Sequence, residues 1–309
     1  MHRTIQIALS SSATDQLLQE LRTLDGVIGL AVFAGASMKP EGDVISVQVL
    51  NHTTDEVMRA VERAHKNGAQ VSVTTAEIAS ISDPENAEAV EFDVDEASWE
   101  EMETGLRHQA HITANYMALM FLGGAVAAIG LREDPVPQAV AFIASAMIAP
   151  GFEPLAKIPL GLVLWRPHLI RHGLLSALFG YTVLVLGAAA MFGILRLAND
   201  SSPLQLARNH EVKSLGHPDL SSIMFSVIGG TAGMIMMAAY RRSVIAGPLL
   251  LLSIIPAAAL IGAGAASLSW PLMKQGIERL AIDVGIIWVT GAVVIALKQW
   301  LVHKRRPFV

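Results

Sequence analysis

The pattern of apolar and polar residues changes once along the chain, near residue 112. Before that point the apolar runs are short, and four of them alternate with polar residues as β-strands do: 3–9, 27–34, 44–50 and 70–75. Two segments between them, 14–24 and 54–66, repeat apolar residues at the spacing of a helix. The order β-α-β-β-α-β predicts a ferredoxin-like α+β domain over residues 1–82. That fold serves many functions, so it does not predict an activity.

Six apolar segments follow, each with roughly the twenty residues that cross a bilayer at about 1.5 Å per residue. They cover residues 112–131, 136–165, 173–197, 223–240, 244–268 and 282–300. Trp165, Trp270 and Trp300 fall at segment ends, where interfacial aromatic residues lie. The pattern predicts an all-α domain of six transmembrane helices over residues 112–309. An acidic linker and an amphipathic helix, residues 83–111, precede it.

The second apolar segment, VPQAVAFIASAMIAPGFEPLAKIPLGLVLW, is interrupted by Pro150 and Gly151. Proline removes a backbone donor and clashes with the preceding helical turn, so a broken helix is expected. Glu153 and Lys157 follow, four residues apart on one helical face. Ionisable groups beside a broken helix at membrane depth indicate a substrate or ion path. The alternative is a kinked helix in which the two residues form a purely structural pair.

An offset of 106 residues relates the two halves of the membrane region. It places Gly123-Gly124 on Gly229-Gly230, and Pro150 on Pro256. Each half then has three segments, and because three is odd the second half enters the membrane from the opposite side. The offset predicts an inverted 3+3 repeat with proline-broken second and fifth helices, an arrangement typical of secondary transporters.

Small residues and one further acid complete the candidate positions. Five glycines are expected where helices approach closely, and they are compatible with a homo-oligomer: Gly123, Gly124, Gly229, Gly230 and Gly233. Asp283 is the only acid deep in the sixth segment, four residues after Arg279. It is assigned to the substrate or ion path, with routine helix-surface pairing as the alternative.

Composition supports a membrane protein with a soluble domain. The 309 residues are 52% apolar, and the mean hydropathy is +0.48. Residues 1–111 carry 7 basic and 19 acidic side chains, and such an acidic region argues against binding to nucleic acid. Basic residues gather on one side if all six segments cross, which predicts a multi-pass protein of the cytoplasmic (inner) membrane with both termini in the cytoplasm.

The sequence has few features of an enzyme or of a metal-binding protein. Cysteine is absent, which excludes disulfides and thiol catalysis. No nucleophile with its base, and no paired-acid motif, is present, so no enzyme and no cofactor are expected. His108 and His111 have a spacing that suits a metal, but two histidines are too few ligands without a third.

Two stretches resemble a known family, the bacterial and archaeal membrane proteins grouped as domain of unknown function 389. Residues 144–162, ASAMIAPGFEPLAKIPLGL, are similar to its G-A-M-(I/L)-(I/S/A)-P-(L/M)-x-P segment. Residues 229–264 resemble its glycine-rich helix, short basic turn and proline-containing helix. The chain departs from that pattern at Ser145, at Gly151-Phe152-Glu153 and at Ala257. The resemblance implies a membrane-embedded core and no established activity.

These observations predict a transporter or channel for a small solute or ion, with a cytoplasmic regulatory domain. Glu153 at the start of a half-helix favours a cation or a proton-coupled substrate. The alternative is a membrane-anchored sensor or scaffold whose ferredoxin-like domain binds a ligand or a partner protein. The expected partners are the lipid bilayer, the solute or ion, and further copies of the chain.

Overall fold

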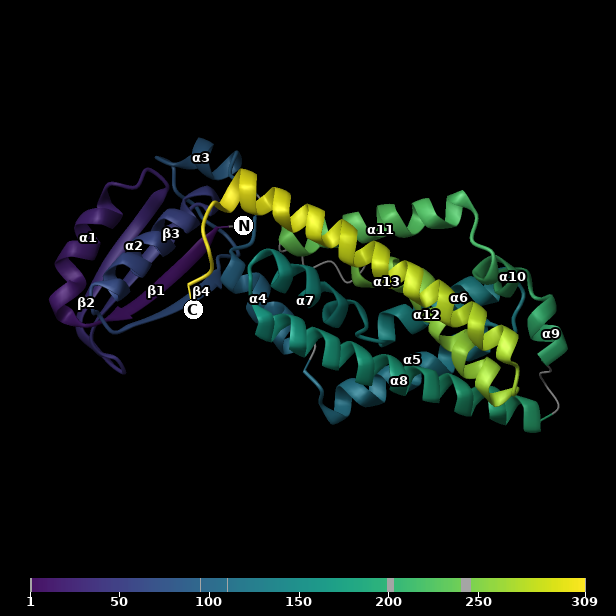
Figure 1. The fold of residues 1–309 in the computed structure, drawn as a ribbon. Coiled ribbons are helices and arrows are strands. Elements are labelled where there is room, and N and C mark those ends of the chain that lie inside the picture. Colours follow the sequence, from purple (N-terminus) through teal and green to yellow (C-terminus); the bar gives the residue numbers. More distant parts are fainter. Residues whose placement is uncertain (1, 95, 110, 199–202, 240–245, 309) are drawn as a thin grey trace. The chain divides into compact units, whose positions relative to one another are not determined.

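The computed structural model describes residues 2–94, 96–109, 111–198, 203–239 and 246–308 (Figure 1). The chain forms two compact units. One consists of Met1–Met102 together with Gln299–Val309, and the other is Glu103–Lys298. The C-terminal residues therefore fold with the N-terminal unit, whereas the sequence pattern had grouped them with the membrane region.

The N-terminal unit is built on a small antiparallel sheet of four strands in the order β2-β3-β1-β4. The strands are β1 (Arg3–Leu9), β2 (Val27–Met38), β3 (Glu41–Val49) and β4 (Val71–Glu77). Helices α1 (Thr14–Arg22) and α2 (Thr54–Lys66) connect them. The element order β-α-β-β-α-β is the predicted one and is that of the ferredoxin-like arrangement.

The core of this unit follows from the two-residue period of the strands. Alternate residues of β1 and β3 point to one face of the sheet, where α1 and α2 cover them. Ile5 of β1 pairs with Val47 of β3 and Thr75 of β4, and both Ile5 and Val47 are fully buried. Burial of these aliphatic side chains is the main source of stability for the sheet.

The acidic segment after β4 is held by hydrogen bonds, although its composition predicted a solvated linker. It contains α3 (Ala87–Glu91) and the start of α4 (Trp99–Gln109). Asp93 accepts a hydrogen bond of 2.6 Å from the Asn51 backbone N–H. Burial alone would raise the pKa of Asp93, but this bond and one from His52 lower the pKa below its ordinary value. Arg3 also donates to Glu101 at 2.6 Å.

A buried ionic cluster, which we call the tail clamp, fastens the C-terminal residues to the N-terminal unit. It consists of Asp55, Glu100, His303 and Arg305. Arg305 donates to both carboxylate oxygens of Glu100 at 2.7 Å and, through Nε, to Asp55. His303 Nδ1 lies 2.7 Å from the other oxygen of Asp55. Phe308 then packs on the apolar core, so the tail is part of that fold.

The tail clamp should make the N-terminal unit sensitive to loss of one cation. Arg305→Gln removes the cation that Asp55 and Glu100 share, and leaves Asp55 with His303 alone as its charged partner, which should lower the free energy of unfolding of this unit by about 2–4 kcal/mol. Hydrogen exchange in the full-length protein would locate the effect in β1 and α2. Arg63→Gln, which removes an exposed pair with Glu20, should cost under ~1 kcal/mol. Equal effects of the two variants would contradict the proposed role of Arg305.

Acid should weaken the tail clamp. Burial alone would raise the pKa of both carboxyl groups. At Asp55 the interactions with His303 and Arg305 outweigh this effect of burial, and at Glu100 the interaction with Arg305 outweighs it. Both pKa values therefore lie below their ordinary values of 3.8 and 4.5. A lowered carboxyl pKa contributes stability above the ordinary value and loses it as pH falls through the folded value. Exchange protection of the N-terminal unit should fall below about pH 4, and less steeply in Arg305→Gln.

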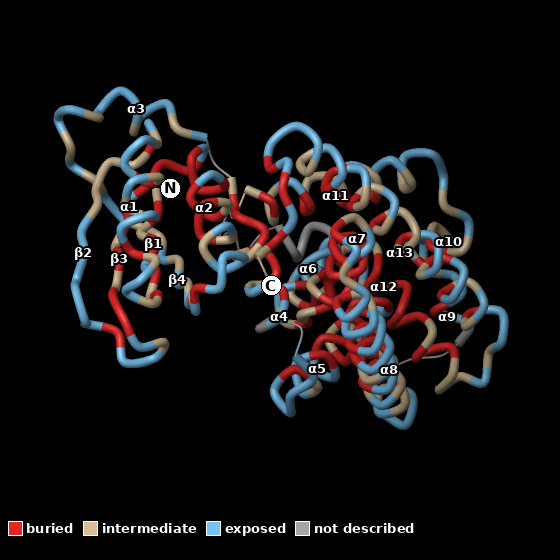
Figure 2. The backbone as a smooth tube through the Cα atoms, turned by 60° about the vertical axis from the view of Figure 1, so that its left-hand side comes forward, coloured by how far each residue is buried: buried red, intermediate tan, exposed pale blue. Residues whose placement is uncertain are grey.

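The second unit is entirely helical among the described residues. Its helices after α4 are α5 (Ala114–Gly130), α6 (Pro135–Ile148), α7 (Phe152–Val163), α8 (Pro167–Leu197), α9 (Pro203–Arg208), α10 (His210–Gly216), α11 (Leu220–Ala238), α12 (Ala246–Ala266) and α13 (Trp270–Lys298). The longest of them, α8 and α13, are mainly apolar. Exposed positions recur along α8 and α11 (Figure 2), and they include large apolar residues such as Leu178 and Ile228.

Three of these helices are long and apolar enough to cross a membrane: α8, α11, and α13 with its continuation to His303. The bent pair α6–α7 would make a fourth, whereas α5 and the part Leu251–Ala266 of α12 are apolar but shorter. Exposed large apolar side chains on such helices are what lipid contact requires. The described helices are therefore consistent with a membrane protein that also has a small sheet-containing unit.

Two predicted elements are wrong in detail. The last apolar helix begins at Trp270, well before residue 282, because Leu268, with φ of +54°, ends α12 and a new helix starts directly after it. The fifth segment was expected to break at Pro256, yet α12 continues through that residue. Three alanines after Pro256 favour helix, whereas Pro150 is followed by glycine. Tyr240 and Val244, which bounded the predicted fourth and fifth segments, lie outside the described residues.

Candidate functional site

The predicted break in the second apolar segment is present. Helix α6 ends at Ile148, α7 begins at Phe152, and the two are bent by 58°. Ala149 is extended, as the residue before a proline tends to be. The Tyr181 hydroxyl of α8 donates to the Gly151 carbonyl at 3.2 Å, so this carbonyl is satisfied within the protein. A side chain at Gly151 would also crowd Tyr181, since an added Cβ would lie 2.9 Å from its hydroxyl.

Glu153 and Lys157 lie on α7 just after the bend, but they do not form an ion pair. No nitrogen–oxygen contact within 4.0 Å joins them, although both residues are described. Lys157 is 3% exposed, and Glu153 has one buried carboxylate oxygen without a hydrogen-bond partner in the described structure. The alternative of a self-neutralising structural pair therefore lacks its contact. A buried carboxylate oxygen without a partner is instead free to accept a proton or a ligand.

A second polar group lies where α11 and α13 meet. Arg279 Nε donates to Asp283 Oδ2 at 2.8 Å, one helical turn away. Ser226 of α11 donates to the other oxygen of Asp283 at 2.8 Å and accepts from Arg279 Nη2 at 3.2 Å. We call Arg279, Asp283 and Ser226 the α11–α13 network. Its two charged side chains are at least 95% buried, so this is an interior pair and not routine surface pairing.

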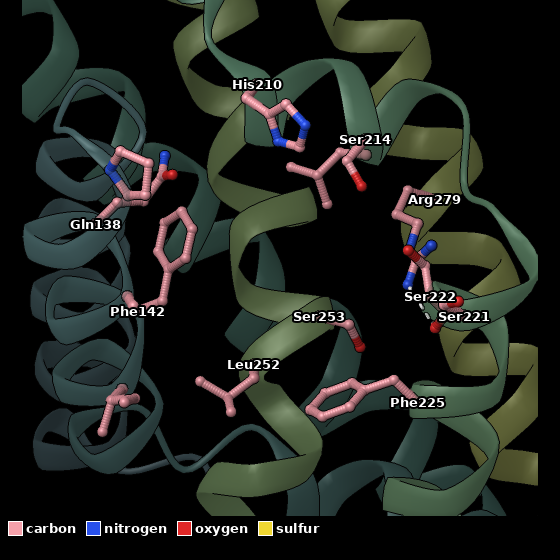
Figure 3. Close-up of a pocket in the computed structure, with 14 residues that line it drawn as sticks. Gln138, Phe142, His210, Ser214, Ser221, Ser222, Phe225, Leu252, Ser253 and Arg279 are labelled. Carbon is pink, nitrogen blue, oxygen red and sulfur yellow. Dashed lines mark hydrogen bonds between the residues drawn. The ribbon is translucent and has the colours of Figure 1, made fainter.

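The α11–α13 network borders a pocket of about 480 Å³ (Figure 3). Helices α6, α10, α11, α12 and α13 line it, and Arg279 points toward it from one wall. Besides Arg279, one histidine, four serines and one amide contribute polar side chains to its lining: His210, Ser214, Ser221, Ser222, Ser253 and Gln138. Aromatic and aliphatic side chains supply the rest: Phe142, Ile143, Phe225, Leu215 and Leu252. Such a cavity, largely apolar with a few convergent polar groups, is typical of a ligand site.

Tyr181 of α8 is a buried polar residue at the bend, and its hydroxyl donates to the Gly151 carbonyl at 3.2 Å. Lys157 of α7 and Asp283 of the α11–α13 network are buried as well. Four of the predicted path residues therefore lie at the bend, on the start of α7 or in the network: Gly151, Glu153, Lys157 and Asp283.

The sequence pattern did not single out the pocket. Arg279 and Asp283 were recognisable as an i, i+4 pair, but Ser226 lies 53 residues away from Arg279 along the chain. The lining serines and Gln138 come from four helices. Sequence alone could have grouped these residues into one site only if the packing of the four helices had been predicted. Pro256, predicted to line the path, lies inside α12 among residues that are fully buried.

The glycines lie where helices approach closely. An added Cβ at Gly124 would collide with the backbone oxygen of Leu184 in α8, and one at Gly230 would come to 2.7 Å of the Thr290 hydroxyl in α13. At Gly123 it would lie 2.7 Å from Ala149 Cβ. Gly229 is half-buried and Gly233 is buried. These contacts are within the chain, so the homo-oligomer stays a prediction.

No group of three metal-ligating side chains is present among the described residues. His111 is exposed, and the side chain of His108 lies outside the described part of the chain.

Comparison with protein families matches residues 146–289 to a family described as Domain of unknown function (DUF389). The matched segment, a little under half of the chain, belongs to this family. The DUF389 residues include the bend, Glu153, Lys157 and the whole α11–α13 network, whereas the N-terminal unit lies outside the match. A search among curated proteins finds no relative. Since the DUF389 description names no activity, function must be argued from the site itself.

The α11–α13 network should behave as a coupled unit. Asp283→Asn leaves Arg279 buried without its carboxylate and should lower the free energy of unfolding by about 3–5 kcal/mol. The double change Arg279→Met with Asp283→Leu removes both charges and should recover most of that loss. Thermal unfolding in nanodiscs would measure both. Glu278→Gln, which removes the exposed 3.6 Å pair with Lys274, is the control and should have little effect. A double variant as unstable as Asp283→Asn would contradict the coupling.

Proposed function

We propose that the helical unit is a transporter for a small solute or ion, regulated by a cytoplasmic N-terminal unit. The observation that supports this most is the pocket bordered by the buried α11–α13 network within apolar helices. Charged groups at membrane depth are expensive, and their usual justification is a substrate, ion or proton pathway. The break between α6 and α7, with the unpaired Glu153 just after it, is the second feature that secondary transporters share.

The pattern of helix packing supports the proposed inverted repeat. Helix α5 packs against α6 and α8 in the first half, and α11 packs against α12 and α13 in the second. Between the halves, α8 packs against α12 while α7 packs against α13. If the two halves are exchanged, the contact between α8 and α12 becomes the contact between α13 and α7, as a pseudo-twofold axis requires. The repeat is not perfect, because α12 is continuous where α6 and α7 are bent.

One pair of helices breaks this correspondence, at the position of the pocket. Helix α5 packs against α12. In the other half of the repeat, α11 corresponds to α5 and α6 corresponds to α12. Residues of both α11 and α6 line the pocket, which therefore lies between these two helices. In alternating access the two halves take unequal arrangements, closed toward one side of the membrane and open toward the other. We interpret the pocket as the open side of such a state.

The proposed topology has six crossings with both termini in the cytoplasm. It counts α5 and α12 as spans and α6–α7 as one broken span. Basic residues such as Arg166, Arg171 and Lys304 then lie on the cytoplasmic side. Arg241 and Arg242, which contribute to the same asymmetry, lie outside the described residues. In this orientation α9, α10 and the pocket face outward.

Single cysteines in this cysteine-free chain test the orientation. His217 and Arg171 are both exposed, and they precede α11 and begin α8 respectively. A membrane-impermeant thiol reagent added to intact cells should label His217→Cys and leave Arg171→Cys unlabelled until the cells are opened. The reverse pattern would invert the topology. Labelling of both from outside would mean that α6–α7 re-enters the membrane without crossing it.

Transport itself is tested by flux into sealed proteoliposomes, with monovalent cations, amino acids and organic acids, with and without a pH gradient. The key variant is Glu153→Gln. Because Glu153 has no ion pair to lose, this change should shift the melting temperature by less than about 3 °C, the effect of ~1 kcal/mol in a unit of this size. If Glu153 takes part in transport, flux should nevertheless be largely lost. Glu278→Gln, at an exposed acid of the same unit, should retain both flux and stability.

Two results would contradict this assignment. Full flux in Glu153→Gln would remove Glu153 from the mechanism. A large loss of stability in that variant would show that the carboxylate is structural, and the double change with Lys157→Met would then separate stability from flux.

A sensor or scaffold is the second candidate function, and the tail clamp is the observation that favours it. Helix α13 carries Arg279 and Asp283 and is followed directly by the clamped tail. A ligand or partner that changed the tail clamp would therefore act on the segment that follows the pocket helix. If cells keep the phenotype of the whole protein when Arg279 and Glu153 are substituted but lose it in Arg305→Gln, sensing is favoured over transport.

A further inference from the structure

We propose that the pocket binds a small organic monoanion, a carboxylate with an apolar body. The site is the one assigned to the solute above, so the claim that this anion is transported rests on the proposed function. The claim that it binds does not. The argument has three parts: the charge at the pocket wall, the number of charges that wall can accommodate, and the character of the remaining surface.

The wall carries a cationic hydrogen-bond donor. Among the described side chains that line the pocket, Arg279 is the one that is formally charged, and His210 is the other ionisable group. Asp283 pairs with Arg279 but is not among the described lining residues. The described contacts of Arg279 use Nε and Nη2, so Nη1 retains its N–H donors. A guanidinium that is 4% exposed and points into a cavity with unused donors is suited to a planar anion.

The α11–α13 network also limits how many negative charges the ligand can carry. Asp283 already compensates the charge of Arg279, so the wall offers hydrogen-bond donors and a local dipole more than a net positive charge. Beside this neutral pair each negative charge of a ligand lacks a compensating cation, so the cost of binding in an apolar surrounding rises with the number of charges. A monoanion has the lowest such cost, and hydrogen bonds from the guanidinium edge and from serine hydroxyls can offset it. Phosphate and dicarboxylates are therefore disfavoured.

The remaining surface favours an organic body. In Figure 3, Phe142 of α6 lies across the pocket from Arg279, and Leu252 and Phe225 lie at the lower end of the view; Ile143 also lines the pocket. These side chains bind hydrocarbon and give an inorganic ion nothing to coordinate. The volume of about 480 Å³ exceeds that of any bare ion and admits a ring or a short chain. Ser221 and Ser222, on the same wall as Arg279, supply hydroxyls for the carboxylate, while Ser214 and Ser253 line the pocket at its other ends.

The test is a binding measurement on the full-length protein in nanodiscs, with benzoate as the probe. Isothermal titration and thermal shift should both detect benzoate. Its neutral isostere benzamide controls for partition into lipid, and phthalate and inorganic phosphate test the charge. Benzoate should bind at least about tenfold more tightly than each of the other three, because only benzoate satisfies both the guanidinium and the apolar walls.

Two kinds of variant separate binding from folding. Arg279→Gln with Asp283→Asn keeps the buried pair neutral and should reduce benzoate affinity by about tenfold or more. Ala139→Phe fills the pocket from an exposed position of α6 without touching the network, and it should abolish benzoate binding. Val140→Phe is its matched control, since Val140 is exposed on the next position and does not line the pocket; its affinity should change by less than about twofold.

Some outcomes would overturn the proposal. Equal binding of benzoate and benzamide would show partition or a purely apolar site. Tighter binding of phosphate would show an inorganic-anion site, and unchanged affinity in Ala139→Phe would place the ligand elsewhere.

Flux distinguishes this proposal from the proposed function. Benzoate binding without flux of any carboxylate would support the anion site and count against transport. Flux of cations alone, with no carboxylate binding, would support transport and overturn the anion site.

Discussion

The ion pair between Arg279 and Asp283 is the interaction on which the helical unit depends. Two charges buried among apolar helices are tolerated only if each finds its partner and their remaining hydrogen bonds are satisfied. Both conditions require α13 to be continuous through residues 279–283, so that the side chains lie one turn apart, and require Ser226 of α11 beside them. The pair therefore fixes how α11 meets α13. It also presents the guanidinium to the pocket as an ordered donor and not as a free charge.

The same sequence spacing leads to different results elsewhere, which limits what sequence can tell. Glu153 and Lys157 are also four residues apart on a helix, yet no ion pair joins them. Arg279 and Asp283 are fixed by a third residue from another helix, whereas Glu153 lies in the first turn of α7, beside Tyr116 and Tyr181. Spacing identifies which side chains can meet on one helix. The neighbouring helix decides whether they do.

The parts of the fold that sequence predicted well are those set by local pattern. Alternation over residues 3–9 and 44–50 identified β1 and β3, and the glycine after Pro150 identified the break between α6 and α7. The pattern failed at Pro256 and at the start of α13, where continuity of the helix is decided by packing and by the neighbouring turn. The pattern also failed to place the C-terminal tail, because Arg305 binds Asp55, which lies 250 residues earlier in the chain.

Helix α13 is the element in which these constraints combine. Arg279 lies in its first half, and its far end passes through the π-helical turn at Gln299–His303 into the tail clamp. The chain therefore connects the pocket helix directly to the tail clamp, with no linker between α13 and the π-helical turn. Because the tail clamp is held by ionic contacts within the N-terminal unit, the end of α13 is tied to that unit by more than the peptide chain alone. Under the proposed function, this connection is the route by which the N-terminal unit would act on the pocket.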